Sequence, residues 1–448
     1  MDLIDAQLRL PAVEPEWVER VRGPGGPLGD MAHAVGGPFH VLHPARFAEN
    51  AAGFRRVLAE YQVPGRVYFG KKANKSGCWL EECTRTDTGV DVASVPEFAE
   101  ALAHGIRGHE IVVTGAAKSD RLVWLAARHG ALLAVDALDE LDRVCALAET
   151  AGTPRILLRV LPETNPHSRF GFTGDELGEA IRRCVAAGDA LRIEGFSFHL
   201  NGYEVAPRAA LAAELIERCR AARAAGLPAD SISIGGGFAV DYLDSADWER
   251  FQREAEDSRS LAELFHAGKQ FTHFYPYHSE PTGSRMLAAI LDTDGLAARL
   301  RETGTRLLLE PGRALLDGCG FSVFPVQGYK PRQDYGIVTV AGLSMSISEQ
   351  WKGSEYLPDP VLWPESGPGE PVSACVGGSS CLDYDMLSWR KIAFPRAPRP
   401  GDLLVYPNTA GYQMDKNETE FHQLPLPARI VVSTENERAR WRIERPLS

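Results

Sequence analysis

The sequence lacks the features that several classes of protein depend on. Its formal net charge is -12, from 48 basic and 60 acidic residues, so it has no excess of basic side chains with which to bind nucleic acid or an anionic membrane. No apolar run approaches the length of a membrane span, and the N-terminus "MDLIDAQLRLPAVEPEW" has no apolar core like that of a signal peptide. We therefore expect a cytoplasmic protein whose partners are small molecules or other proteins.

Cysteine is scarce and scattered. The eight cysteines form neither CxxC pairs nor a regular spacing, so the sequence gives little support for a zinc site or a disulfide framework. We expect a reduced protein without a metal site.

What the chain does have is length and an ordinary globular composition. Its 448 residues are 44% hydrophobic and 24% charged, and glycine and proline are spread along the chain. This is enough for a barrel of about 250 residues together with a further domain.

From about residue 39 to residue 316, β-like runs alternate with amphipathic helical ones. The β-like runs are "FHVLH", "RVYFG", "GVDVAS", "EIVVTG", "LLAVDA", "RILLRV", "IEGFSFHL", "SISIGGG" and "RLLLEPG". The helical runs include "PARFAENAAGFRRVLAEY", "VPEFAEALAHG", "ALDELDRVCALAETAG", "GDELGEAIRRCVAAG" and "PRAALAAELIERCRAARAAG". This alternation predicts an α/β fold with a parallel sheet, and the number of units favours a (β/α)8 TIM-like barrel over the alternative, a doubly wound sheet.

After residue 316 the pattern changes to β-type pieces separated by turns, which predicts a mostly antiparallel β-domain. These pieces are "FSVFPVQGYK", "YGIVTVAGLSMSI", "PVSACVGGSS", "GDLLVYPN", "LPARIVVS" and "RWRIERP". We expect three parts: an N-terminal segment, residues 1–38, that packs with the C-terminal domain; the barrel, residues 39–316; and the β-domain, residues 317–448.

Two segments allow more than one interpretation. Residues 244–285 form a charged and aromatic insertion, either a surface helical excursion or an active-site lid. Residues 343–363 are longer than a hairpin needs, and either pack the β-domain around Trp351 and Trp363 or help to form a substrate pocket.

The stretch "FGKKANKS", residues 69–76, places three lysines after a β-like run. Such a cluster is commonly a solvated turn. At the end of a buried strand, however, one ammonium can be held near the barrel interior, where its pKa falls. Strand alternation predicts that Lys71 and Lys72 point to opposite sides, with Lys75 in the following turn.

Two motifs at strand ends suit an anion. In "SISIGGGFAVDY" the run Gly235, Gly236 and Gly237 follows a strand, forming either a tight turn or a backbone cradle for a phosphate. In "LLLEPGRALLDG", Glu310 and Arg313 form either a structural ion pair or part of a cofactor site.

Two further motifs carry single reactive side chains. His199 ends the strand "GFSFHL", where it is either a packed residue or a ring that stacks on a cofactor. "SSCLDYDML" contains Cys381 with Asp383 and Asp385, and such a cysteine is either buried and inert or catalytic.

Taken together, these motifs resemble the fold type III decarboxylases that use pyridoxal 5′-phosphate, the group of the diaminopimelate, ornithine and arginine decarboxylases. The resemblance runs from about residue 38 to residue 425 and makes the chain a divergent member. It implies an alanine racemase-like barrel followed by a decarboxylase-like β-domain. The motifs that follow in the family's order are "FGKKAN", "GVDVAS", "LLRV", "HSRFGF", "FHLNG", "IGGGF", "LEPGR", "SSCLDYD" and "NTAGY".

Carried onto this sequence, the resemblance makes Lys72 the Schiff-base lysine and stacks His199 on the cofactor ring. Glu310 would pair with the pyridine nitrogen, which favours decarboxylation because the related alanine racemases place an arginine there. The resemblance assigns the phosphate to Gly235, Gly236, Gly237, Arg313 and Tyr412. Asp91 and Arg159 would also bind cofactor, and Arg169 would contact substrate.

The resemblance also implies a homodimer with shared active sites, in which Cys381 of one subunit donates a proton to the substrate's α-carbon in the other. An amino-acid racemase or epimerase on the same fold is the alternative enzyme. A catalytically inactive homologue that binds a partner protein is the non-enzymatic alternative, although both Lys72 and Cys381 are present.

The sequence departs from the family's pattern at two site positions. Where the family follows the histidine with Gly-Ser, this chain has Asn201 and Gly202. Where relatives acting on diamino substrates place an acid after the cysteine, it has Leu382, and Asp383 or Asp385 would have to substitute. We therefore expect an unusual or conjugated amino acid as the substrate.

Overall fold

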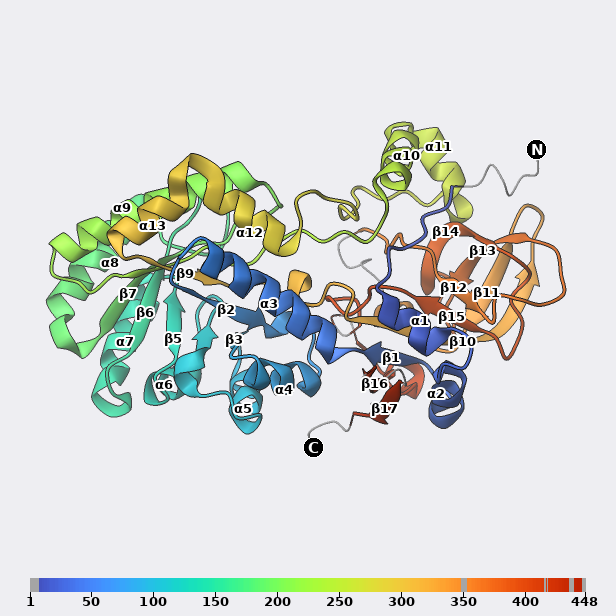
Figure 1. Ribbon diagram of the computed structural model, residues 1–448, viewed down its shortest axis with the longest axis horizontal. Helices are drawn as coiled ribbons and strands as arrows, with labels where there is room; N and C mark the ends of the chain where they lie inside the picture. Colours follow the sequence, from blue (N-terminus) through green and yellow to red (C-terminus); the bar gives the residue numbers. More distant parts are fainter. Residues whose placement is uncertain (1–7, 348–352, 415, 417, 435–438, 445–448) are drawn as a thin grey trace. The chain divides into compact units, whose positions relative to one another are not determined.

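The computed structural model describes residues 8–347, 353–414, 416, 418–434 and 439–444, which form two compact units (Figure 1). Unit 1 contains residues 1–46, 240–280 and 316–448, and unit 2 contains residues 47–239 and 281–315. Each unit is therefore built from segments that are far apart in the sequence.

Unit 2 is a closed barrel of eight parallel strands, which confirms the predicted fold class. The strands are β2 (Gly65–Gly70), β3 (Gly89–Val92), β4 (Ile111–Val113), β5 (Leu132–Val135), β6 (Arg155–Arg159), β7 (Arg192–Ser197), β8 (Ser231–Ser233) and β9 (Arg306–Leu309). The α-helices that accompany them are α3 (Pro44–Glu60), α4 (Gly77–Arg85), α5 (Val95–Ala103), α6 (Asp120–Arg128), α7 (Leu138–Ala151), α8 (Gly174–Ala187), α9 (Val205–Ala224), α12 (Gly283–Asp292) and α13 (Leu296–Thr303).

The barrel sequence contains clear signals for its own turns and core. Ser94, Ser119 and Thr173 begin α5, α6 and α8, and each side chain accepts a hydrogen bond from a main-chain N–H of the first turn. A buried cluster drawn from β2, β4, β5, β6 and β9 contains Tyr68, Val112, Leu132, Leu157 and Leu308. Side chains that fill a barrel in this way hold its strand ends in fixed positions.

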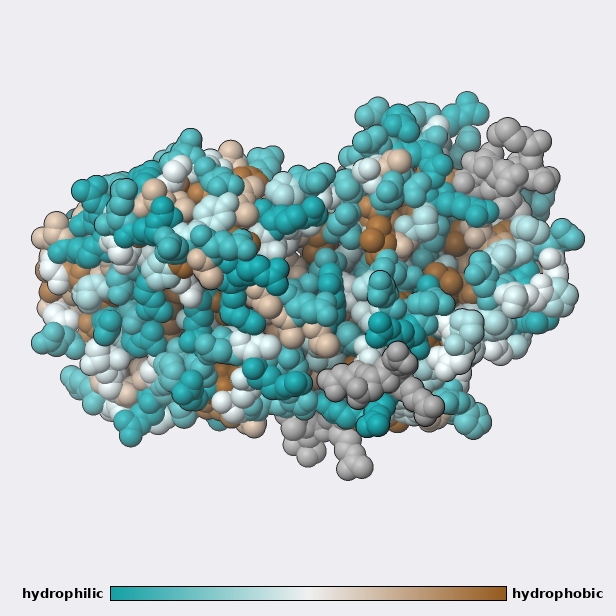
Figure 2. Space-filling model, viewed as in Figure 1, coloured by the Kyte–Doolittle hydropathy of each residue, from teal (hydrophilic) through white to brown (hydrophobic). Residues whose placement is uncertain are grey.

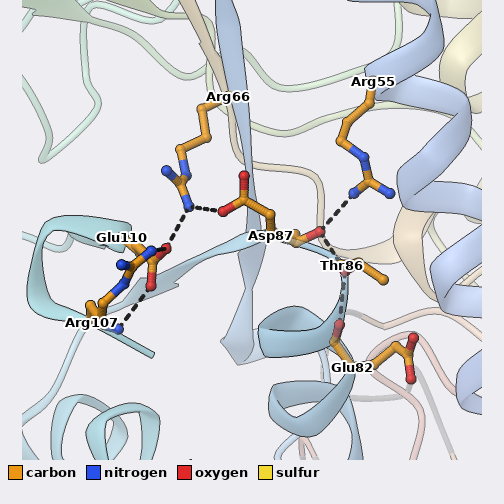
Figure 3. Close-up of polar contacts among 8 residues, drawn as sticks. Arg55, Arg66, Glu82, Thr86, Asp87, Arg107 and Glu110 are labelled. Atoms are coloured by element: carbon orange, nitrogen blue, oxygen red, sulfur yellow. Dashed lines mark hydrogen bonds and ion pairs between the residues drawn. The ribbon is translucent and has the colours of Figure 1, made fainter. Parts of the chain in front are cut away.

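Charged side chains form a network where β2, β3 and β4 begin (Figure 3). Arg66 Nη2 lies 3.0 Å from Asp87 Oδ1 and 3.2 Å from Glu110 Oε1, and Arg107 Nη2 lies 2.8 Å from the same Glu110 oxygen. Beside it, Arg55 Nη1 donates to Thr88 Oγ1 at 3.1 Å. The hydrogen bond from the Arg107 side chain is the largest cause that lowers the pKa of Glu110 to about 2.

Unit 1 is organised around a nine-stranded, mostly antiparallel sheet, as predicted. Its main path runs β14-β13-β11-β10-β1-β16-β17, and β15 pairs with both β10 and β12. The strands are β1 (Phe39–Leu42), β10 (Gly320–Pro331), β11 (Gly336–Val340), β12 (Val361–Trp363), β13 (Val372–Gly377), β14 (Met386–Phe394), β15 (Leu403–Tyr406), β16 (Ala428–Ser433) and β17 (Arg440–Ile443).

The N-terminal helices α1 (Glu16–Arg22) and α2 (Leu28–Val35) share a core with this sheet. Trp17, Val21 and Met31 pack in one buried cluster with side chains of β1, β10, β15 and β16. The strand over residues 39–42, which we placed at the start of the barrel region, is β1 of this sheet. It pairs antiparallel with β10 and parallel with β16, and all four of its residues are buried.

Most of the predicted insertion, residues 244–280, belongs to unit 1, and residues 281–285 belong to unit 2. Residues 244–280 form α10 (Ser245–Glu256), α11 (Ser258–Leu264) and an irregular stretch, and several of their aromatic side chains are buried. Phe251 and Phe265 are each 1% exposed and Tyr277 is fully buried. The aromatic composition of this segment is therefore explained by packing.

On the face that Figure 2 shows, hydrophilic residues predominate over both units. Among the described residues, no helix is long and apolar enough to cross a membrane. Within the same residues, no group of histidine, cysteine or carboxylate side chains is arranged to hold a metal ion.

Candidate active site

Lys72 lies directly after β2, in the 3-10 helix η1 (Lys71–Ala73). Its Nζ is 3.9 Å from Oδ2 of Asp91, a residue of β3. The two side chains are close because Gly70, at the end of β2, is the partner of Asp91 in the parallel register of the two strands. Asp91 is only 2% exposed, and its other oxygen accepts a 2.6 Å hydrogen bond from Thr114 Oγ1. Burial raises the pKa of Asp91 to about 7, against the opposing effect of Lys72, and the nearby Glu310 charge raises it further.

The structure corrects our view of the lysine cluster. Lys71 is the buried lysine of the cluster: its side chain is 1% exposed, and its Nζ lies 2.7 Å from Glu100 Oε2. Lys72, which the resemblance makes the Schiff-base lysine, has a side chain that is 53% exposed. Strand alternation does not separate the two, because β2 ends at Gly70 and both lysines belong to η1.

Glu310 follows β9 and is tied to the glycine run that follows β8. Its Oε1 accepts a 2.6 Å hydrogen bond from Ser233 Oγ, and its main-chain N–H donates to the Gly235 carbonyl at 2.9 Å. These two contacts fix the carboxylate where two adjacent strands end. Arg313, in the 3-10 helix η6 (Arg313–Leu315), is also buried in this unit.

The glycine run approaches its neighbours too closely for any other residue. A Cβ at Gly235 would lie 2.7 Å from His199 Nδ1, one at Gly236 would lie 2.6 Å from the Glu310 carbonyl oxygen, and one at Gly237 would lie 2.7 Å from Arg208 Nη2. Gly235 and Gly237 also have positive φ angles of 66° and 77°. A bare main-chain cradle of this kind fits the phosphate of the expected cofactor.

Burial is the largest cause that lowers the pKa of His199, to about 3, and the Lys72, Arg159 and Arg208 charges lower it further. The ring is therefore neutral at neutral pH. A neutral imidazole can lie against an aromatic cofactor without bringing an additional charge.

Arg159 and Arg169 lie near the end of β6, on the ring of Phe170. The guanidinium carbon of Arg159 is 4.3 Å from the ring centroid, and that of Arg169 is 4.6 Å from it. Arg159 Nη1 also lies 3.8 Å from Oδ1 of Asp136, a buried carboxyl whose pKa is raised by burial. Cation-rich surroundings of this kind are suited to a carboxylate or phosphate ligand.

Four predicted site residues belong to unit 1 and not to the barrel: Cys381, Asp383, Asp385 and Tyr412. Cys381 is exposed, and its N–H donates to His422 Nε2 at 3.4 Å. The ring of Tyr412 lies 5.2 Å from Lys416 Nζ.

Asp385 has a structural position that we did not expect. Its two carboxylate oxygens accept hydrogen bonds from the main-chain N–H groups of Ser344 at 2.7 Å and Ser380 at 3.1 Å. The side chain is therefore engaged in bracing two loops, so it is poorly suited to bind a substrate ammonium. Asp383 is exposed.

The chain neighbours of Cys381 line a pocket of about 370 Å³ in unit 1. Its walls are mainly apolar, and Met345, Tyr384 and Phe421 are among the few large hydrophobic side chains that are exposed in the described part of the chain. The residues lining this pocket, which we call the cysteine-side pocket, are Leu343, Ser344, Met345, Ser380, Leu382, Tyr384, Asp385, Glu418, Thr419 and Phe421. Trp351 lies outside the described residues. Trp363 does not line this pocket, and its Nε1 donates a hydrogen bond to the Arg22 carbonyl at 2.8 Å.

Sequence reasoning missed Ser233, Thr114 and Arg208. The alternation of serine and isoleucine in "SISIGGG" could have identified Ser233, because it places Ser231 and Ser233 on one face of the strand and Ser233 at its end, next to the glycine run. Thr114 and Arg208 gave no such signal.

Comparison with known proteins shows similarity to pyridoxal-dependent decarboxylases. The sequence model described as "Pyridoxal-dependent decarboxylase, pyridoxal binding domain" matches residues 46–276. A Sinorhizobium fredii protein named uncharacterized protein y4yA is 37% identical over 418 residues, covering 91% of this chain and 90% of that protein. A diaminopimelate decarboxylase of Actinosynnema pretiosum is 28% identical over 413 residues, covering 87% and 82%.

Among solved structures, diaminopimelate decarboxylase from Helicobacter pylori, in complex with L-lysine, has a similar fold. It superposes with a TM-score of 0.73 at 17% identity, covering 93% of this chain and 96% of that one.

Proposed function

Because this chain belongs to the pyridoxal-dependent decarboxylase family, we propose that it removes the α-carboxylate of an amino acid or amino-acid conjugate, giving an amine and carbon dioxide. It is an enzyme whose cofactor is pyridoxal 5′-phosphate. When bound, this cofactor supplies an electron sink for the electron pair released at the substrate's α-carbon. We propose that unit 2 binds the cofactor.

The observation that carries the proposal is the position of Glu310. Its carboxylate is held by Ser233 at the same end of the barrel as the Lys72–Asp91 pair. A carboxylate there would keep the cofactor's ring nitrogen protonated, which loss of carbon dioxide requires and racemisation does not. We therefore assign Glu310 to the ring nitrogen.

The other residues of the barrel would orient the cofactor and the substrate. Lys72 would carry the cofactor, and Asp91 would hold a proton near its Nζ, since the two groups lie 3.9 Å apart. The neutral His199 ring would cover one face of the cofactor. The groups that we assign to the phosphate are Gly235, Gly236, Gly237, Arg313 and Tyr412, while Arg159 would contact the cofactor and Arg169 the substrate.

We assign the proton that returns to the α-carbon to Cys381 Sγ of a partner subunit in a homodimer. Its exposure in unit 1 suits a residue that acts on another chain. We further propose that the protein works in the cytoplasm, as expected for a chain whose eight cysteines are all free.

The cysteine-side pocket suggests the chemistry of the substrate's far end. The two carboxylates that line it are both occupied, Asp385 by main-chain N–H groups and Glu418 by Arg429 at 3.0 Å. Leu382 occupies the position directly after the cysteine, where an acidic residue would attract a substrate ammonium. We therefore propose that the far end of the substrate is uncharged and apolar, and that Leu382 contacts it.

The test is carbon dioxide release across a panel of amino acids with apolar, acidic, cationic and conjugated side chains. We expect apolar or conjugated substrates to be preferred, and Leu382→Asp to lower kcat/KM for them at least about tenfold. Leu426→Asp is the matched control, because Leu426 is 39% exposed and does not line the pocket.

Three results would count against the proposal. Exchange of the α-hydrogen without carbon dioxide would indicate a racemase. A preference for lysine or ornithine would contradict the apolar far end. Unchanged turnover and product in Cys381→Ala would remove Cys381 from the reaction.

A further inference from the structure

Arg208 lies in the first turn of α9 and is fully buried, although it is a charged residue. Its Nη1 donates to the carbonyl oxygens of Ile234 at 3.1 Å and Gly236 at 3.0 Å. Its Nη2 donates to those of Gly202 at 3.2 Å and Gly237 at 3.3 Å. One guanidinium thus joins the glycine run to the loop that contains Gly202.

The charge of this guanidinium has no counter-ion in the described part of the chain. Its four acceptors are main-chain carbonyls, no carboxylate of the described residues forms an ion pair with it, and its buried Nε has no hydrogen-bond partner. Burial lowers the pKa of Arg208 to about 10, so the group still carries its charge at neutral pH. A buried cation without an anion is unfavourable, and an anionic ligand nearby would relieve that penalty.

The orientation of the glycine peptides indicates where such an anion would bind. In a trans peptide the carbonyl and the following N–H point in opposite directions. Because the Gly236 and Gly237 carbonyls point to Arg208, the N–H groups of Gly237 and Phe238 point away from it. The guanidinium therefore polarises these peptides so that their donors face the opposite side of the loop.

We propose that Arg208 is a positioning residue for the cofactor phosphate: it fixes the glycine run with its N–H donors turned outward, and its charge balances the phosphate across that loop. It would do so in place of the serine hydroxyl that "HLNGY" lacks, since Gly202 contributes only a carbonyl to the same guanidinium. This proposal rests on the assignment of Gly235, Gly236 and Gly237 to the phosphate.

The experiment compares pyridoxal 5′-phosphate with pyridoxal, which lacks the phosphate. Both are titrated into the cofactor-free protein, and binding is followed by absorbance. Arg208→Met is expected to weaken binding of the phosphorylated form at least about tenfold and to change pyridoxal binding no more than about twofold. Arg208→Lys, which keeps the charge without the planar fork, is expected to recover part of the loss.

The matched control is Arg220→Met. Arg220 lies on the same helix but is 61% exposed and paired with Glu217, so binding of both ligands should be unchanged. If Arg208→Met fails to fold, Arg208→Lys is tested by the rise in melting temperature that inorganic phosphate gives the cofactor-free protein. A rise as large as in the wild type would overturn the proposal.

Equal losses for the two ligands in Arg208→Met would mean that Arg208 only stabilises the loop, and would also overturn it. The result is distinct from the decarboxylase assignment: an enzyme that distinguishes the two ligands through Arg208 but releases no carbon dioxide would retain this inference and lose the proposed reaction. If the wild-type protein binds both ligands equally, the assignment of the phosphate to the glycine run is wrong.

Discussion

Asp91 and Glu110 belong to neighbouring parts of the same barrel, at β3 and directly before β4, yet their carboxyl groups meet opposite surroundings. Glu110, where the strands begin, accepts from Arg107 and Arg66, and its pKa falls to about 2. Asp91, towards the ends of the strands, is buried with one lysine 3.9 Å away, and its pKa rises to about 7.

The contrast separates two uses of charge in one fold. At the beginnings of the strands, carboxylates are paired with arginines and stabilise the barrel. At the ends of the strands, charged groups are buried with incomplete compensation, which destabilises the free protein but keeps them available to a ligand. Arg208, without a counter-ion among the described residues, follows the second pattern.

The largest difference between the two ends should appear in activity. Lys72→Ala is expected to lower kcat by at least about a hundredfold, because the reacting group of the proposed site would be lost. The melting temperature should change little, since the Lys72 side chain is 53% exposed. Carbon dioxide release measures kcat, cofactor absorbance reports whether the cofactor band is retained, and calorimetry measures the melting temperature. An active Lys72→Ala enzyme with its cofactor band intact would refute the assignment.

The next difference should appear in stability at the beginnings of the strands. Arg155 Nε and Nη2 lie 2.7 Å and 3.0 Å from the two oxygens of Glu194, whose side chain is 5% exposed. Glu194→Leu should lower the free energy of unfolding by about 3 kcal/mol, because it leaves a partly buried guanidinium unpaired. Turnover per folded molecule should stay the same.

Urea unfolding of Glu194→Leu is compared with that of Glu214→Leu, which breaks the exposed Arg218–Glu214 pair on α9. The control should lose no more than about 0.5 kcal/mol. Equal losses of unfolding free energy in both variants would mean that the buried pair at the beginnings of the strands stabilises the fold no more than the exposed pair does.

The smallest expected effect is on the pH dependence of stability. It tests the contrast most directly, because the changes expected for variants of Glu110 and of Asp91 have opposite signs. The lowered pKa of Glu110 stabilises the fold above pH 4.5, and this contribution is lost as the pH falls towards 2. Glu110→Gln should therefore reduce stability by about 1 kcal/mol at pH 7 and by progressively less in acid.

The raised pKa of Asp91 acts in the other direction. Between pH 3.8 and about 7 the unfolded chain has released the proton that the folded protein retains, so the wild type loses stability as the pH rises through this range. Asp91→Asn should be about 1 kcal/mol more stable than the wild type above pH 7 and equal to it near pH 4. Melting curves across this range would contradict the contrast if both variants shifted in the same direction.

The sequence was sufficient to predict the parts of the fold and site that depend on residues close together in the chain. Strand and helix runs recur with clear caps such as Ser94 and Thr173, and the parallel barrel follows from their alternation. The glycine run and Glu310 could be placed at strand ends for the same reason.

Other features depend on partners that are distant in the sequence. The pattern of β1 indicates a strand but not which sheet it joins. We did not identify β14, because Arg390 occupies a buried position in it and is satisfied by the distant Leu8 and Leu357 carbonyls. Arg208 looked like one more charged residue on an amphipathic helix, since its four acceptors come from two other loops. Strand alternation could not be applied to Lys71 and Lys72, because β2 ends at Gly70 and both lysines lie in η1.

The place of β1 in its sheet has a consequence for how the protein is made. Phe39 pairs with Val323 on one side and with Ala428 on the other, so the middle of the sheet in unit 1 joins the two ends of the chain. A ribosome adding about 5–20 residues per second would need roughly 14–57 s to pass from Phe39 to Val323 and roughly 20–80 s to pass from Phe39 to Ala428. In the first of these intervals β1 has neither neighbour, while the barrel segments are already emerging. We therefore expect newly made chains to depend on chaperones that shield this N-terminal strand, and the last strands of the chain to set the time at which unit 1 can close.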